Sequence, residues 1–326
     1  MRACMNRFAK LIACLSTVLI PASGAAQAYP SKPIRLIVPF PAGGANDIIG
    51  REIAQKLTVA LQQQVVVDNR GGANAIIGSD IAAKAAPDGY TILIVPSSHA
   101  INPAMYAKLP YDTLKDFAPV ILIGPGAYVL VANPSLPIAN TRELIALARS
   151  KPGELRFGSS GIGNVTHLAA ELFMKMAGVT FLHVPYKGGG PALTELIGGQ
   201  ISIFFGTISV MLPQIKADRV RALAVTTAQR FPVIANIPTI AESGLPGYEV
   251  SGWYGIVAPA RTPRPIIALL NTAIKKSLDT AEVKEKLLTL GVEATGSSPE
   301  SFGAYIATEL DRWRKLVTSV GIAVQS

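Results

Sequence analysis

Short apolar segments alternate with amphipathic segments along most of this chain. The first three apolar segments are residues 34–38, 64–68 and 90–95, and residues 47–61 and 76–85 between them have apolar side chains at helical spacing. Continuous apolar strands joined by amphipathic helices are typical of parallel sheets that helices cover on both faces. The same alternation starts again after residue 126. The sequence therefore predicts an α/β fold, with enough chain for two lobes.

Two glycine loops each connect a predicted strand to a predicted helix. The first runs through Phe40, Pro41, Ala42, Gly43 and Gly44 to Asn46 and Asp47, and the second through Ser159, Ser160, Gly161, Ile162 and Gly163 to Asn164. Glycine adopts positive φ without steric cost, and a helix start presents unpaired N–H groups that attract anions. If the lobes face each other, both loops could hold one anion. The alternative is that each is a tight turn that binds nothing.

Hydroxyl groups follow other predicted strands. Ser97 and Ser98 come directly after the strand at 90–95, where open α/β sheets present loops to ligands, and Gly206 and Thr207 end the strand at 201–205. These hydroxyls could donate to a carboxylate, or they could simply cap the segments that follow.

The three histidines, His99, His167 and His183, are not accompanied by a nucleophile, a metal cluster or paired carboxylates at motif spacing. A lone histidine is more often a packing or hydrogen-bonding residue than a catalyst. No spacing matches a P-loop, a Rossmann fingerprint or a nucleophile elbow. We therefore expect no enzyme activity, no cofactor and no metal, with an exported hydrolase or lyase using a histidine base as the alternative.

The N-terminal segment has the features of a secretory signal peptide. Basic residues precede the apolar run 11–20, and small residues lead to Ala28, after which we expect cleavage. Both cysteines, Cys4 and Cys14, lie in residues 1–28, so we expect no thiol or disulfide chemistry in the mature protein. Removing three Lys/Arg lowers the formal charge from +9 to +6 over the remaining 298 of 326 residues. That mild charge without a basic cluster argues against nucleic-acid binding.

Two segments suggest crossings between the lobes. Gly124-Pro125-Gly126 separates two apolar runs and suits the first crossing. Residues 221–227 suit the second crossing, in which the chain returns to the first lobe. The predicted division is residues 1–28 for the signal peptide, 29–125 with 228–326 for lobe 1, and 126–227 for lobe 2.

These features together resemble the substrate-binding receptors of tripartite tricarboxylate transporters, also called Bug-type periplasmic solute-binding proteins. The matching residues span the mature chain: 29–35, 41–44 with Asp47, 100–103, 158–161 with 167–169, 183–188 and 252–255. The resemblance implies a type II periplasmic-binding fold, in which two α/β lobes joined by two crossing segments close over a small organic carboxylate. It also implies export to the periplasm and delivery of the ligand to membrane permease subunits. We expect a monomer, and a receptor for a membrane signalling partner is the alternative role.

The resemblance also assigns site residues. Residues 40–44 and 159–161 would hold one carboxylate, and Ser97, Ser98, Gly206 and Thr207 would contact the rest of the ligand. Asn164, His167 and Tyr186 are further candidates, and Asp47 would cap its helix or orient a water. Family members often have Asp-Asn followed by Leu-Pro-Ser where this chain has Gly206-Thr207-Ile208-Ser209-Val210. This departure argues against assuming that the ligand is that of any relative, particularly an amino acid whose ammonium group would need a carboxylate, although Asp47 could supply that charge.

Overall fold

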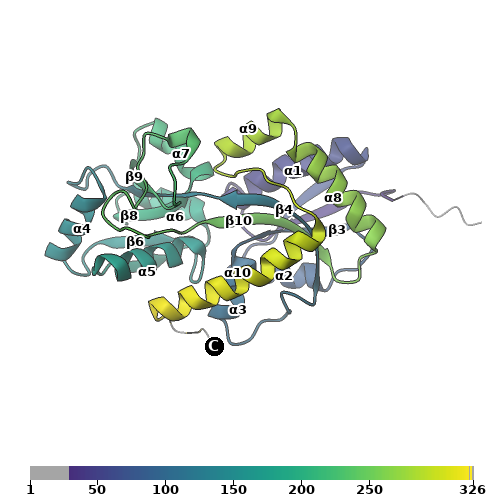
Figure 1. Ribbon diagram of the computed structural model, residues 1–326, viewed down its shortest axis with the longest axis horizontal. Helices are drawn as coiled ribbons and strands as arrows, with labels where there is room; N and C mark the ends of the chain where they lie inside the picture. Colours follow the sequence, from purple (N-terminus) through teal and green to yellow (C-terminus); the bar gives the residue numbers. More distant parts are fainter. Residues whose placement is uncertain (1–28, 323, 325–326) are drawn as a thin grey trace, which may run out of the picture.

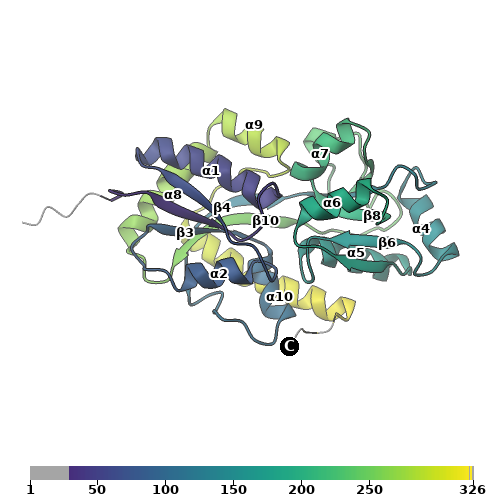
Figure 2. The same cartoon turned by 180° about the vertical axis from the view of Figure 1, so that it is seen from behind.

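The computed structural model describes residues 29–322 and 324, so the predicted signal peptide lies outside the described residues. Two five-stranded sheets form two lobes that lie side by side (Figures 1 and 2). Helices cover both faces of each sheet, which confirms the predicted α/β fold of two lobes.

The first sheet has the strand order β2-β1-β3-β10-β4. Strand β1 pairs in parallel with β2 and β3, whereas β10 is antiparallel to both of its neighbours. The strands are β1 (Ile34–Val38), β2 (Val65–Asn69), β3 (Thr91–Pro96), β4 (Phe117–Gly126) and β10 (Gly252–Pro259). The helices of this lobe are α1 (Ala45–Leu61), α2 (Ile76–Ala83), α3 (Ser98–Met105), α8 (Arg264–Leu278), α9 (Ala281–Thr289) and α10 (Pro299–Val320).

The second sheet has the order β7-β6-β8-β5-β9, with β6 parallel to β7 and β8 and with β5 antiparallel to β8 and β9. The strands are β5 (Tyr128–Ala132), β6 (Arg156–Ser159), β7 (Leu182–Pro185), β8 (Ile203–Thr207) and β9 (Arg221–Val225). Its helices are α4 (Thr141–Ser150), α5 (Val165–Ala177), α6 (Gly189–Ile197) and α7 (Ile208–Lys216).

The hydrophobic core has two layers because side chains alternate between the faces of each strand. In β1, Leu36 packs in the layer that contains α1, α8 and α9, and Ile37 packs in the layer that contains α3 and α10. The same division continues in the second lobe, with α6 and α7 on one face and α4 and α5 on the other. Strands buried on both faces explain why the apolar runs in the sequence are continuous rather than alternating.

Gly124-Pro125-Gly126 is the end of β4, which pairs with β10 through Gly126 and Gly252. Because β5 begins at Tyr128, we propose the first crossing at Ala127. Two other local predictions were wrong. Residues 221–225, predicted as the return crossing, form the edge strand β9 beside β5. The N-cap of α4 is Asn140, whose side chain accepts from the Glu143 amide, and not Thr141. The predicted Ser298 cap of α10 is confirmed by its bond from the Ser301 amide (3.1 Å).

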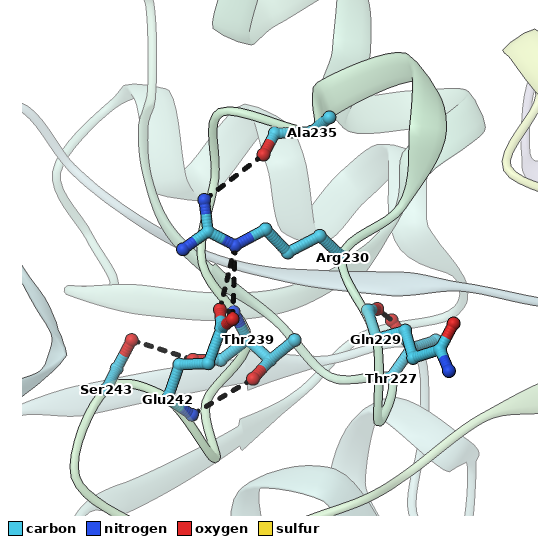
Figure 3. Close-up of polar contacts among 7 residues, drawn as sticks. All are labelled: Thr227, Gln229, Arg230, Ala235, Thr239, Glu242 and Ser243. Carbon is cyan, nitrogen blue, oxygen red and sulfur yellow. Dashed lines mark hydrogen bonds and ion pairs between the residues drawn. The ribbon is translucent and has the colours of Figure 1, made fainter.

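The connection between β9 and β10 hydrogen-bonds to the second sheet. The amide of Ile240 donates to the Val225 carbonyl (2.9 Å) and that of Val250 to the Thr226 carbonyl (2.9 Å). Figure 3 shows how this connection is held by its own side chains, with Glu242 accepting from Arg230 (2.9 Å) and from the Thr239 amide (2.8 Å). The lobe boundaries remain a prediction, and these contacts lead us to propose the second crossing near Ser251 rather than at residue 228.

Candidate ligand-binding site

The starts of five helices converge on one cavity between the lobes. Helices α1 and α3 contribute from the first lobe and α5, α6 and α7 from the second. Each of these helices directly follows a strand of its sheet, so the convergence results from strand ends that face each other across the cleft. First-turn amides carry partial positive charge, and here five first turns face the same space.

The structure brings most of the predicted site residues to this cavity. Those that line it are Phe40, Pro41, Ala42, Gly44, Ser97, Ser98, Ser160, Asn164 and Thr207. Gly161 and Tyr186 line an adjoining pocket at the mouth of the cleft instead. The remaining candidates, Gly43, Asp47, Ser159, His167 and Gly206, line neither of these two pockets.

Asp47 stabilises the first glycine loop through hydrogen bonds outside the cavity. Its carboxylate accepts from the Gly43 amide (3.0 Å) and from Asn69 Nδ2 (3.0 Å), and it forms an ion pair with Arg51 (3.0 Å). Burial alone would raise the pKa of Asp47, but the hydrogen bonds from Arg51, Gly43 and Asn69 hold this pKa below its usual range. Asp47 therefore fixes the shape of the loop and does not face the cavity.

The second glycine loop is braced in a similar way by its own side chains. Thr166 Oγ1 accepts from the Ser160 amide (2.8 Å), Ser159 Oγ from the Gly161 amide (3.3 Å) and His167 Nδ1 from the Gly163 amide (3.2 Å). We expected these amides to point at a ligand. In the structure these amides instead donate to side chains of the loop and of the first turn of α5. A buried amide without a hydrogen-bond partner would cost about 1–3 kcal/mol.

Two residues of the cavity lining each have a buried polar atom without a hydrogen-bond partner among the described residues. These atoms are Ser98 Oγ and Asn46 Oδ1. Neighbouring Ser97 differs, because its Oγ accepts from the Trp253 amide (2.7 Å). Buried polar groups are nearly always paired in folded proteins, so unpaired groups in a cavity mark a place for a polar ligand.

Among residues 29–322, the cavity lining contains one charged side chain, Lys187, and no aspartate or glutamate. Tyr128 and Tyr254 lie on opposite sides of the crossing and also line the cavity. Burial raises the pKa of both phenols above the ordinary value, so both are neutral groups that can donate to a ligand. Such a lining favours an anion, and among the described residues it provides no carboxylate to pair with an ammonium group.

Sequence analysis did not assign Asn46, Tyr128, Lys187 or Tyr254 to the site. Asn46, Lys187 and Tyr254 lie inside or directly beside segments that carry the family resemblance, so proximity to those motifs was a usable signal. Tyr128 is the first residue of β5 after the crossing and has no such signal.

The histidines are packed rather than exposed to the cavity. His99 is buried between the rings of Tyr111 and Phe117, and burial lowers its pKa to about 4. His183 stacks on His167 at 4.1 Å, and burial and the neighbouring His167 lower its pKa to about 3. Ser159 Oγ lies 2.6 Å from His183 Nε2, but the Ser159 side chain is fully buried outside the cavity.

In residues 29–322 no group of three or more His, Cys, Asp or Glu side chains is arranged to hold a metal ion. None of the helices in this range is both long enough and apolar enough to cross a membrane.

Comparison with known proteins identifies relatives of this chain. A Pseudomonas sp. (strain P51) protein named for the tcbD-tcbE intergenic region is 41% identical over 312 residues, which cover 94% of this chain and 93% of that protein. Protein BugT of Bordetella pertussis is 37% identical over 309 residues, or 94% of this chain and 95% of BugT.

Solved structures agree in fold. Rpa4515 of R. palustris, solved with adipate, has a TM-score of 0.89 and 38% identity over 90% of this chain and 99% of that one. MatC from Rhodopseudomonas palustris, solved with bound malate, has a TM-score of 0.83 and 31% identity over 89% of this chain and 100% of that one. The model of the tripartite tricarboxylate transporter family receptor matches residues 49–322. The predicted Bug-type resemblance is therefore confirmed, and this chain belongs to the tripartite tricarboxylate transporter receptor family.

Proposed function

We propose that this protein is a periplasmic receptor that captures a small organic carboxylate and delivers it to the membrane permease of a tripartite tricarboxylate transporter. The observation that carries the proposal is the convergence of five helix starts on a cavity whose lining, in the described part of the chain, has no acidic side chain. Helix starts stabilise bound anions, and an acidic group in the cavity would oppose them.

The ligands of two relatives support this choice of ligand class. Rpa4515 was solved with adipate and MatC with malate, and both ligands are carboxylates without an ammonium group. Ser98, Lys187 and the two tyrosines in the lining carry hydrogen-bond donors, which suit the same class. Several charge-assisted hydrogen bonds in a closed cleft are enough for micromolar affinity, on the order of −8 kcal/mol.

The histidine environments support a binding role rather than catalysis. Ser159 and His183 are within hydrogen-bond distance, but Ser159 lies outside the cavity and its Oγ also accepts from the Gly161 amide. A substrate in the cavity would therefore not meet this pair, whose position instead stabilises the second glycine loop.

Ligand-dependent melting tests the proposal. We expect mono-, di- or tricarboxylates to raise the melting temperature, and amino acids and sugars to leave it unchanged. Asn46→Asp adds a negative charge to the cavity lining and should weaken carboxylate binding at least about 100-fold. Asn140→Asp is the matched control, because an aspartate there still caps α4. An unchanged melting temperature across the carboxylate panel would count against the proposal, as would equal binding by both variants.

Export, the monomeric state and the permease partner are parts of the same proposal. Uptake of a labelled carboxylate by cells with and without the gene separates transport from sensing. Loss of uptake on deletion supports the permease role, whereas unchanged uptake with a lost transcriptional response supports a signalling partner.

A further inference from the structure

A second pocket continues the cavity to the mouth of the cleft. The two spaces share Phe40, Pro41, Ser160 and Lys187 in their linings, so these four residues form a neck between them. Pro41 belongs to the first lobe, and Ser160 and Lys187 belong to the second. We call the outer pocket the vestibule, and its other main residues are Gly72, Asn74, Ile77, Tyr106, Ile162 and Tyr186.

The vestibule is more apolar than the cavity behind it. Ile77 is 48% exposed and Ile162 is 37% exposed, and these two aliphatic side chains come from opposite lobes. Tyr106 and Tyr186 add half-buried rings. Lys187 at the neck is the one charged side chain that the described residues contribute to the vestibule lining. Aliphatic side chains that two separate lobes expose at a single opening provide apolar surface for a ligand that passes between them.

An unusual backbone turn forms one wall of the vestibule. Ala73, Asn74 and Ala75 are consecutive non-glycine residues with φ of 46°, 50° and 76°. Left-handed residues of this kind cost free energy and persist where surrounding contacts enforce them, often at ligand sites. Asn74 Nδ2 donates to Asn102 Oδ1 (2.9 Å), and Asn164 Nδ2 of the other lobe donates to Asn74 Oδ1 (3.2 Å).

The turn also holds Ile77 in place. A Cβ atom at Gly72, which has φ of +135°, would lie 2.5 Å from Ile77 Cδ1, so the isoleucine side chain rests on the glycine. The wall of the vestibule therefore consists of a left-handed backbone turn, an interlobe hydrogen bond from Asn164 to Asn74, and a glycine that leaves room for Ile77.

We propose that the vestibule binds the apolar tail of the ligand, so that the receptor selects elongated carboxylates with one charged head and an alkyl or aryl body. The inference rests on the proposed function, because the head occupies the cavity. The head lies against the helix starts and Lys187, and the tail passes the neck between Pro41 and Ser160. Ile77 and Ile162 then cover the tail from the two lobes.

A titration series of unbranched carboxylates tests the inference. Calorimetry with butanoate, hexanoate, octanoate and decanoate should show affinity rising about fourfold for each methylene that enters the vestibule. The double variant Ile77→Ser with Ile162→Ser should bind octanoate about tenfold more weakly and butanoate unchanged. Val59→Ser is the matched control, because Val59 is 74% exposed on α1 and lines neither the cavity nor the vestibule.

The outcomes separate this inference from the proposed function. If no carboxylate of any length binds, both are overturned. If butanoate and octanoate bind equally, or if the double variant binds octanoate as the wild type does, only the vestibule assignment is overturned. The same calorimetry is done with the unbranched dicarboxylates of eight and ten carbons. Tighter binding of these dicarboxylates than of the monocarboxylates of equal length would place a second charge in the vestibule and overturn the apolar-tail assignment.

Discussion

Neighbouring serines at the start of α3 have different hydrogen-bonding states. Ser97 Oγ accepts from the Trp253 amide (2.7 Å), which ties the segment after β3 to the neighbouring strand β10 of the same sheet. Ser98 Oγ is buried in the cavity lining with no partner among residues 29–322. Both hydroxyls could be predicted from sequence as site candidates, because they follow the end of a strand. Only the tertiary packing distinguishes the hydroxyl that has a structural hydrogen bond from the hydroxyl that is available to a ligand.

This difference gives a paired prediction. Ser97→Ala should lower the free energy of unfolding by about 1–3 kcal/mol, because the buried Trp253 amide loses its acceptor. Ser98→Ala should leave stability unchanged or slightly higher and weaken carboxylate binding about tenfold, because the ligand loses a donor. Urea unfolding and calorimetry measure the two quantities. Equal destabilisation by both variants, or unchanged binding by Ser98→Ala, would refute the assignment.

At the scale of elements, hydrogen bonds connect the start of α5 to the turn before α2. Asn164 caps α5 through Oδ1, which accepts from the Thr166 amide (3.2 Å), and its Nδ2 reaches Asn74 in the other lobe (3.2 Å). Thr166 in turn accepts from the Ser160 amide (2.8 Å). The glycine loop of the second lobe is therefore linked directly to the contact that holds the lobes together.

Asn74→Gly tests this link, because glycine retains the left-handed conformation and removes the side chain. An interlobe hydrogen bond contributes about 0.5–1.5 kcal/mol, so we expect carboxylate affinity to fall about two- to tenfold. We also expect the radius of gyration of the ligand-free protein to rise in X-ray scattering. Gln62→Gly is the control, since Gln62 is also left-handed but exposed at the end of α1. An effect of equal size in the control would show that the interlobe bond is not the cause.

At the scale of the whole molecule, stability depends on pH through a histidine that folding keeps neutral. His99 is 1% exposed, and burial lowers its pKa from 6.5 to about 4. Above pH 6.5 the ring is neutral in both states. Between pH 6.5 and about 4 the unfolded chain binds a proton that the folded chain does not, so stability falls as the pH falls.

The expected slope from His99 is up to about 1.4 kcal/mol per pH unit in that window. His99→Phe should flatten the pH dependence by that amount, because the ring packs between Tyr111 and Phe117 and neither ring nitrogen has a hydrogen-bond partner in the part of the chain that the structure describes. Urea unfolding at pH 4.5, 5.5 and 7.5 measures the slope for each protein. Parallel slopes for the wild type and the variant would contradict the buried neutral histidine.

The sequence by itself determined the order of strands and helices and the α/β class, because apolar runs and helical periodicity are local properties. It also identified the two glycine loops and the serines after β3, because strand ends of such sheets face one opening. It missed α3, which contains Pro103, and misread β9, because their structure depends on neighbours that are distant in sequence.

Only the tertiary structure decided which groups of the candidate site remain available. Asp47 and the Ser160 and Gly161 amides belong to motifs visible in the sequence, yet their hydrogen bonds are made within the loops. Asn46, Ser98, Tyr128, Lys187 and Tyr254 come from segments far apart in the chain and meet only where the two sheets face each other. The physical reason is that local sequence sets backbone conformation, whereas the partners of a polar group depend on how the lobes pack together.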